Sequence, residues 1–118
     1  MTNHEREAEV SKRDYLGDFE QVVLLAVMRL GPDAYGVSIK HEIEQRAHRK
    51  VTLGAIYPTL DRLEAKGLVS SRVGKPTAER GGRAKRHFEI SAAGRKALRR
   101  SREMLAALWD GFEQEATP

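Results

Sequence analysis

The apolar residues of this chain recur at helical spacing in four stretches and alternate with polar residues in two shorter ones. Spacings of three and four residues indicate amphipathic helices, whereas alternation indicates half-buried strands. The helical stretches cover residues 19–30, 35–48, 53–66 and 92–115, and the strand-like ones cover residues 68–73 and 85–90. The pattern predicts a mainly α fold with a small β-hairpin, in which three helices precede the hairpin and a long helix follows it.

The first predicted helix differs from the others because residues 22–28 are apolar on every side. Asp18 is followed three residues later by Gln21, which resembles a capping box at the helix start. A helix without a polar face has to be covered all round. Because a chain of 118 residues has a modest core, we expect the flank around Val23 and Val27 to contact a second subunit.

The second and third helices each carry one buried face. Asp33 is the expected cap of the second helix, in which an apolar side chain recurs every four positions. Thr52 can cap the third helix and Gly67 can end it. Pro58 lacks the N–H that the carbonyl four residues earlier would accept. Either the first turn is loose, or the regular helix begins nearer to Tyr57.

The final helix has a second apolar seam. Ser91 can cap it, and its apolar positions then advance in alternating steps of three and four residues. Such spacing gives a coiled-coil-like seam of about two heptads, which is enough for a dimer contact. The residues expected in the dimer interface are Val23, Val27, Leu98, Leu105, Leu108, Trp109 and Phe112.

Charge is unevenly distributed along the chain. The 21 basic and 17 acidic residues give a net charge of +4, but residues 68–102 hold 11 basic and only 2 acidic side chains. The segments before and after this one have net charges of −1 and −4. A basic segment of this density indicates a polyanionic partner. For a basic run taken alone, a solvated charged surface is the alternative.

The sequence offers no recognisable catalytic or metal-binding pattern. It contains no cysteine, which excludes disulfides and thiolate metal sites and fits a cytoplasmic location. The four histidines do not fall at metal-ligand spacings, and no serine or threonine has a recognisable base partner. Neither a signal-peptide pattern nor an apolar run near the ~20 residues of a membrane span is present. We therefore expect no enzyme activity, no cofactor, no metal and no membrane contact.

Three helices followed by a basic hairpin are the outline of a winged helix-turn-helix domain. The third helix would keep its leucines inward and offer its outer face to the major groove of duplex DNA, which admits a helix. The hairpin would lie along phosphates or enter the adjoining minor groove. The residues expected at the DNA are Thr52, Gly54, Ala55, Thr59, Arg62, Lys66, Arg72, Lys75, Arg80, Arg83, Lys85 and Arg86.

Three segments resemble one family of proteins. The stretch LGAIYPTLDRLEAKGL, residues 53–68, resembles the recognition-helix signature of the PadR family of bacterial transcriptional regulators. Residues 34–37 resemble the Tyr-Gly opening of that family's second helix, and residues 81–94 resemble its glycine-arginine wing and capped last helix. The similarity covers about residues 16–109, and three motifs in the right order are a specific signal.

The resemblance implies a homodimeric DNA-binding repressor that a small effector relieves. It adds Tyr35 and Tyr57 to Thr59 and Arg62 at the DNA interface. The single final helix matches the smaller subgroup of the family rather than the longer one with a multi-helix effector domain. Some small members hold flat aromatic ligands between subunits, beside a tryptophan of the last helix. A small hydrophobic effector near Trp109 is therefore one expectation, and packing of Trp109 in the dimer seam is the alternative.

The expected organisation is a flexible arm at residues 1–14, a winged helix-turn-helix domain at residues 15–91 and a dimerisation helix at residues 92–118. The predicted function is sequence-specific regulation by a homodimer on a near-palindromic operator. The alternative is a winged-helix interaction adaptor whose basic wing docks an acidic partner. The small, polar outer face of the third helix argues against an adaptor, because protein interfaces favour aromatic anchors. RNA binding would need stacking aromatics on an exposed sheet, for which Phe88 alone is thin support.

Overall fold

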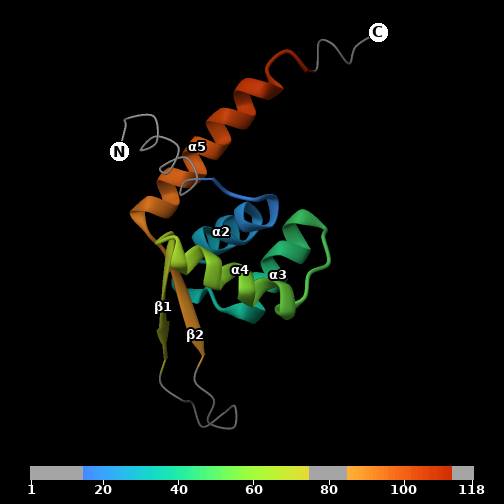
Figure 1. Cartoon of the computed structure of the whole chain (residues 1–118). Helices are drawn as coiled ribbons and strands as arrows, with labels where there is room; N and C mark the ends of the chain where they lie inside the picture. The colour runs from blue at the N-terminus through green and yellow to red at the C-terminus, as the bar shows by residue number, and fades with distance from the viewer. Residues whose placement is uncertain (1–14, 75–84, 113–118) are drawn as a thin grey trace, which may run out of the picture.

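The computed structural model of the protein describes residues 15–74 and 85–112. In chain order the elements are α2 (Asp18–Leu30), the 3-10 helix η1 (Gly31–Asp33), α3 (Gly36–Ala47), α4 (Leu53–Ala65), β1 (Val69–Val73), β2 (Arg86–Ile90) and α5 (Ala92–Trp109) (Figure 1). The predicted fold class, a mainly helical winged helix-turn-helix with one hairpin and a C-terminal helix, is confirmed. The expected arm and the wing residues Lys75, Arg80 and Arg83 lie outside the described residues.

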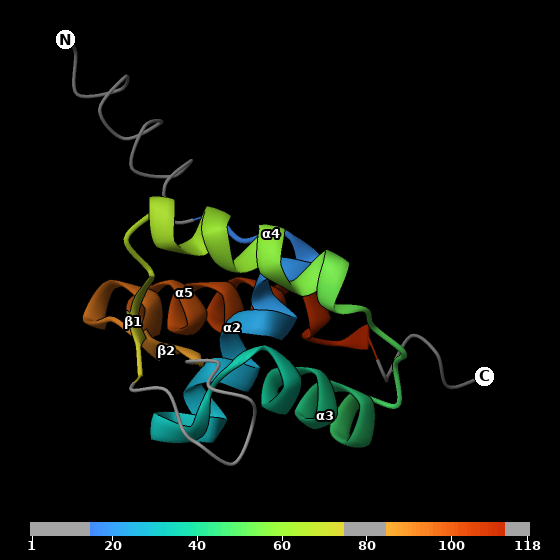
Figure 2. The same ribbon diagram turned by 90° about the horizontal axis from the view of Figure 1, so that it is seen from below.

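Helix α2 is the centre of the core. It contacts α3, α4, β2 and α5, and Figure 2 shows it between α3 and α4. Val23, Leu24 and Val27 are fully buried in this arrangement. The prediction that Val23 and Val27 contact a second subunit is therefore wrong, because the chain's own elements already cover these side chains.

The start of α2 lies one residue before the predicted capping box. Gly17 is the N-cap residue, and its N–H donates to Oε1 of Glu20 at 2.9 Å. Asp18 is thus the first helical residue, and the predicted pairing with Gln21 is wrong. A glycine has no side chain to cap the helix, so Glu20 supplies the reciprocal half of the capping box alone.

The start of α3 is also displaced from the prediction. Asp33 belongs to η1, and the chain runs two further residues before the helix begins. Tyr35 is the N-cap residue, and its N–H donates to Oγ of Ser38 at 2.9 Å. The expected cap at Asp33 is wrong because the 3-10 turn uses residues that the pattern assigned to a simple linker. The carbonyl of Asp33 instead accepts a hydrogen bond from the Ser38 hydroxyl.

Helix α4 begins and ends as predicted. Oγ1 of Thr52 accepts a hydrogen bond from the N–H of Ala55 at 3.1 Å. Gly67, with a φ of 76°, follows the helix in the left-handed region that favours glycine. Pro58 lies inside the helix, which starts regularly at Leu53. Of the two alternatives for Pro58, the structure shows neither a loose first turn nor a late start.

The hairpin is a two-stranded antiparallel sheet in which Val69 pairs with Ile90 and Val73 with Arg86. On its other edge β2 meets the start of α3, where the N–H of Phe88 donates to the carbonyl of Ala34 at 2.9 Å. Phe88 is buried in the core. Since side chains alternate along a strand, the residues between the inward-facing ones lie on the outer surface of the wing.

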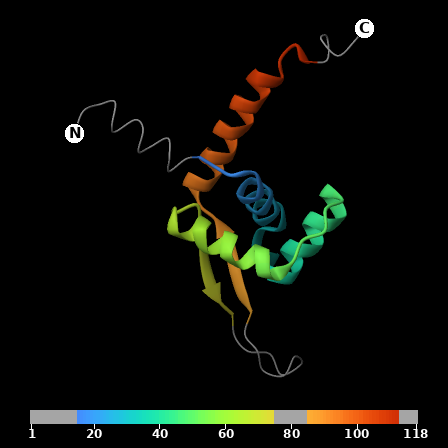
Figure 3. The same ribbon diagram turned by 45° about the vertical axis from the view of Figure 1, so that its right-hand side comes forward.

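Helix α5 begins in the core and projects away from it (Figures 1 and 3). Oγ of Ser91 accepts from the N–H of Gly94 at 3.0 Å, which confirms the predicted cap. Ala97 and Leu98 are buried, whereas every described residue from 102 onward is exposed. The helix ends at Trp109 rather than near residue 115, because Asp110 leaves the helical conformation and Gly111 has a φ of 80°.

Candidate nucleic-acid interface

The outer face of α4 is exposed and does not pack against the core of the protein. Ile56, Leu60 and Leu63 are completely buried and hold the helix on the core. The opposite side exposes small and polar residues together with one aromatic and one cationic side chain. The exposed residues of this segment are Thr52, Gly54, Ala55, Tyr57, Pro58, Asp61, Arg62 and Ala65. A helix with such a face fits a major groove about 12 Å wide.

Thr59 does not belong to this exposed face. It is 1% exposed, its hydroxyl donates to the carbonyl of Ala55 at 2.9 Å, and its oxygen accepts from Nη2 of Arg62 at 3.0 Å. A threonine inside a helix often bonds the carbonyl four residues earlier, which turns the hydroxyl inward. The expectation of a direct DNA contact by Thr59 is therefore wrong in this conformation. Its oxygen instead contacts the guanidinium of Arg62, which is exposed on the outer surface.

Lys66 is bound within the molecule rather than offered to a partner. Its Nζ donates to Oε2 and Oε1 of Glu20 at 2.9 and 3.0 Å and to the carbonyl of Tyr15 at 3.1 Å. The pair joins the end of α4 to the start of α2. Burial alone would raise the pKa of Glu20, but the hydrogen bonds from Lys66 and the Gly17 N–H outweigh it and lower that pKa. The predicted DNA contact by Lys66 is thus replaced by a structural ion pair.

Arg86 also forms ion pairs within the protein. Its Nη1 is 3.2 Å from Oδ1 of Asp61, and its Nη2 is 2.6 Å from Oε1 of Glu64. The hydroxyl of Ser71 donates to Oε2 of Glu64 at 2.7 Å. These bonds fix the hairpin against α4, so the predicted DNA contact by Arg86 is wrong here. Asp61 and Glu64 are not among the predicted site residues, and no sequence spacing links either to a strand more than twenty residues away.

The base of the wing carries cations that remain on the surface. Nζ of Lys85 lies 4.2 Å from the ring centroid of Tyr35, in a cation–π contact. The Tyr35 ring in turn lies 5.6 Å from the ring of His87. Arg72 is exposed on β1, opposite His87 in the strand register. Tyr35 and Lys85 therefore lie together at the base of the wing, and Arg72 is exposed on the neighbouring strand.

A second surface of interest lies on the projecting part of α5. Leu108 is 75% exposed, Trp109 is 59% exposed, and Leu105 and Phe112 are exposed beside them. The rings of Trp109 and Phe112 are in edge-to-face contact with centroids 4.7 Å apart. Leu98, by contrast, is largely buried against the core. Together with α2, this helix borders an open groove of about 490 Å³ that reaches from Leu25 to Trp109.

The described residues form neither a metal site nor a membrane span. No group of three or more histidine, aspartate or glutamate residues at 15–74 and 85–112 could hold a metal ion. Within the same ranges, no helix has the length and apolar character that crossing a membrane requires. The candidate functional surfaces are therefore the exposed face of α4, the cationic wing and the apolar end of α5.

The chain is similar to known proteins in sequence. The sequence model described as "Transcriptional regulator PadR-like family" matches residues 24–100. The Transcriptional regulator Rv3488 of Mycobacterium tuberculosis is 37% identical over 76 residues, which are 64% of this chain and 66% of that protein. An uncharacterized protein in transposon TN4556 of Streptomyces fradiae is 34% identical over 98 residues, which are 83% of this chain and 26% of that protein. The chain thus spans about a quarter of the transposon protein and just under two thirds of Rv3488.

A solved structure agrees with the sequence relatives. The PadR family transcriptional regulator from Eggerthella lenta DSM 2243 superposes with a TM-score of 0.67 over 98% of this chain and 94% of its own, at 20% identity. At that identity the likeness concerns the fold, in which the winged helix and the C-terminal helix correspond. With the family match over residues 24–100 and the relative Rv3488, the assignment is clear. This chain belongs to the PadR-like family of transcriptional regulators, which regulate transcription by binding DNA.

Proposed function

We propose that the chain is a repressor that binds a near-palindromic operator as a homodimer. The observation that carries the proposal is the outer face of α4, which is exposed along its length and flanked by the cationic wing. A helix in the major groove and a wing on the neighbouring backbone together read sequence and fix register. Binding that covers a promoter blocks transcription without any catalytic step.

The proposed DNA contacts follow from exposure. On α4, small residues allow close approach, Tyr57 and Arg62 reach outward, and Arg62 is the residue with the geometry to read a guanine edge. The wing supplies phosphate contacts. The proposed contact residues within the described part of the chain are Tyr35, Thr52, Gly54, Ala55, Tyr57, Arg62, Arg72 and Lys85. Lys75, Arg80 and Arg83 lie outside it and are proposed from their charge in the sequence alone.

The homodimer is proposed from the apolar end of α5. Exposed leucine and aromatic side chains along a helix that projects from its own domain indicate a protein contact. An antiparallel or crossed pair of such helices would bury these side chains in a two-fold interface. Two-fold symmetry would then present two α4 helices to successive major grooves, on the order of 34 Å apart.

The test is binding of the purified chain to the DNA upstream of its own gene, measured by fluorescence anisotropy over a salt series. We expect affinity to fall steeply with salt, because basic side chains release counterions from phosphates. Arg62→Ala should relax base preference, whereas Arg72→Gln should weaken all sequences alike. Lys66→Met serves as the matched control, since Lys66 is bound to Glu20 and should not change affinity.

Two outcomes would contradict the proposal. If Arg62→Ala and Arg72→Gln both leave affinity unchanged, the assigned contact surface is wrong. If the wild-type chain fails to bind mixed duplex fragments even at low salt, the interaction-adaptor function is favoured instead. A reporter gene placed behind the bound promoter separates repression from activation, because a repressor lowers its expression and an activator raises it.

The groove between α2 and α5 is the place we assign to a small hydrophobic effector. Its volume of about 490 Å³ and its apolar lining from Leu25 to Trp109 suit a planar molecule held between subunits. Titration with a planar dye should quench Trp109, which is the only tryptophan of the chain. Absence of quenching at micromolar dye would leave Trp109 with a packing role alone.

A further inference from the structure

Asp61 is an acidic residue near the middle of the exposed face of α4. Its side chain is 64% exposed. Since a helix turns about 100° per residue, Asp61 lies about 140° around the helix from the buried Ile56. Its neighbours along this strip are Gly54, Pro58 and Ala65, none of which has a side-chain group that forms hydrogen bonds. Because these neighbours are small, the short side chain of Asp61 can reach the molecule that the strip faces.

Arg86 of β2 neutralises Asp61 only in part. Its Nη1 is 3.2 Å from Oδ1 of Asp61, whereas its Nη2 is 2.6 Å from Oε1 of Glu64. Two carboxylates thus share one guanidinium, and the shorter contact is with Glu64. Within residues 15–74 and 85–112, Oδ2 of Asp61 accepts no hydrogen bond. Asp61 therefore keeps a free acceptor oxygen, while the bond to Arg86 fixes the direction of its carboxylate.

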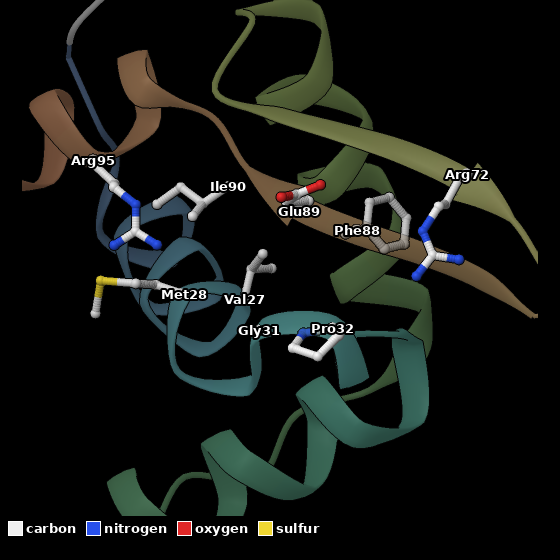
Figure 4. A pocket seen from close by; sticks show the side chains of 9 residues that line it. All are labelled: Val27, Met28, Gly31, Pro32, Arg72, Phe88, Glu89, Ile90 and Arg95. Atoms are coloured by element: carbon white, nitrogen blue, oxygen red, sulfur yellow. The ribbon is translucent and has the colours of Figure 1, made fainter.

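The contact with Asp61 comes from the face of the hairpin that is turned toward α4. Arg86 and Ser71 both bond Glu64 from this face. Arg72 follows Ser71 in β1 and points to the opposite face, because side chains alternate along a strand. There it borders a cavity of about 220 Å³ between the hairpin, α2 and η1 (Figure 4). The charge of Arg72 is thus directed away from Asp61, and Arg86 alone of these two arginines ties it to the wing.

A carboxylate acceptor on a surface that enters the major groove distinguishes the four bases. Cytosine presents the N4 amino donor there, which aspartate can bond, whereas guanine and thymine present acceptors that repel a carboxylate. Adenine presents its N6 amino donor beside the N7 acceptor, so one carboxylate oxygen would be attracted and the other repelled. Phosphates repel a carboxylate as well. The charge of Asp61 therefore opposes binding to any sequence that does not place a cytosine amino group against it.

We propose that Asp61 reads a cytosine in the major groove, with Oδ2 accepting a hydrogen bond from the N4 amino group and Arg86 positioning the carboxylate. This rests on the proposed function, in which the outer face of α4 lies in the major groove of an operator. Asp61 selects by repulsion of the wrong bases as well as by attraction to the right one. In a two-fold dimer the cytosine occurs once in each half-site.

Base preference is measured by selecting bound duplexes from a randomised library with the purified full chain and sequencing them. We expect the wild-type motif to contain one cytosine per half-site that Asp61→Asn replaces with adenine, because an amide bonds N6 and N7 of adenine together. The new amide oxygen can still accept from Arg86, so the wing stays in place. Asp61→Ala should lower the discrimination at this position by about fivefold or more.

Glu64→Gln is the matched control. It removes one negative charge beside the same guanidinium, but Glu64 lies on the flank of α4 that faces the hairpin. It should change the affinity for all sequences alike and leave the motif unchanged. If Asp61→Asn behaves in the same way as Glu64→Gln, Asp61 has only a charge or positioning role, and the proposed base contact is overturned.

The contact itself is tested with a duplex in which the selected cytosine is replaced by 2-pyrimidinone, which pairs with guanine but lacks the 4-amino group. Wild-type affinity should fall by about fivefold or more. Affinity of Asp61→Ala should not fall further, because the interacting pair is already broken. An equal loss in both proteins would attribute the effect to the altered base pair and overturn the contact.

Failure of the proposed function gives a different result. A wild-type chain that binds duplexes but selects no motif would refute operator recognition, and the role of Asp61 with it. A wild-type motif that Asp61→Asn leaves unchanged would refute the role of Asp61 alone and leave operator recognition standing.

Discussion

The hydroxyl of Tyr57 in α4 lies against the Cα of Gly36 in α3, where a larger residue has no room. A Cβ built on Gly36 would overlap this hydroxyl and lie 2.6 Å from Cζ of the same ring. Tyr57 keeps 39% of its surface exposed, so one side of the ring locks the two helices together and the other faces outward. The tyrosine and the glycine of two separate sequence motifs are therefore one contact in space.

Gly36→Ala should destabilise the protein by about 1–3 kcal/mol, because the added methyl group forces the Tyr57 ring out of its place. Urea unfolding measures the change. Gly54→Ala is the matched control, since the nearest atom to its Cβ would be 3.8 Å away, and it should be neutral or slightly stabilising. In a Tyr57→Ala background the cost of Gly36→Ala should largely vanish. An undiminished cost there would show that the glycine serves another purpose.

Gly94→Ala should be more damaging than Gly36→Ala. A Cβ on Gly94 would overlap the carbonyl oxygen of Leu68 and lie 2.7 Å from Cγ1 of Ile90. Because a backbone carbonyl cannot rotate away as a side chain can, the first turn of α5 has to lift from the hairpin, at a cost of about 3 kcal/mol. Thermal unfolding tests this, and Ala93→Ser at an exposed neighbouring position should change stability by less than about 0.5 kcal/mol.

Lys66→Met should reduce stability without reducing the affinity of the folded protein for DNA. The largely buried carboxylate of Glu20 loses the ammonium that neutralises it, which costs about 1–2 kcal/mol for a pair that is partly open to solvent. Denaturant unfolding and DNA titration on the same preparation separate the two effects. A loss of affinity with unchanged stability would restore Lys66 to the DNA interface.

Acid should weaken the fold through Glu20. Its pKa is lowered in the folded protein, despite the opposing effect of burial, by hydrogen bonds from Lys66 and the Gly17 N–H. The ionised Glu20 carboxylate therefore contributes its full stabilisation above the ordinary glutamate pKa of about 4.3. This contribution is lost as the pH falls through the lower pKa that Glu20 has in the folded protein. The pKa values of Glu42 and Glu44 are lowered as well, by hydrogen bonds from Arg29 and Lys40 respectively.

Unfolding free energies measured from pH 7 down to pH 3 test this dependence. Glu20→Gln should make the protein less stable at pH 7 and flatten its loss of stability on acidification, since one titrating group is gone. The flattening should be partial, because Glu42 and Glu44 still titrate. A curve parallel to that of the wild type would mean that Glu20 has the same pKa in the folded and unfolded chain.

Leu108→Glu should shift the protein from dimer to monomer. The leucine is 75% exposed in the single chain and belongs to the apolar end of α5 that we propose as the dimer seam. A carboxylate there would be buried without a partner in the dimer. Ala107→Glu, about 160° around the helix from the seam residues Leu105 and Trp109, is the control and should leave the dimer intact. Sedimentation velocity measures both, and a dimeric Leu108→Glu protein would contradict this interface.

The sequence predicted the elements well, because each rests on local chemistry. Apolar spacing gave the order of helices and strands, and Thr52 and Ser91 cap their helices as expected from residues three positions away. Glycine at position 67 ends α4 for an equally local reason, its positive φ. The starts of α2 and α3 were predicted less well, since the actual N-cap residues, Gly17 and Tyr35, have no capping side chain and their N–H groups donate instead to Glu20 and Ser38.

Which charges face outward was decided only by the tertiary structure. Lys66 and Arg86 carry the same charge as Arg72 in the sequence, but the first meets Glu20 across 46 residues and the second meets Glu64 across 22. Val23 and Val27 were likewise placed by elements far along the chain that close over α2. A local pattern fixes the period of a helix and its buried side, whereas the pairing of a surface charge depends on which distant side chain folding brings within hydrogen-bond reach.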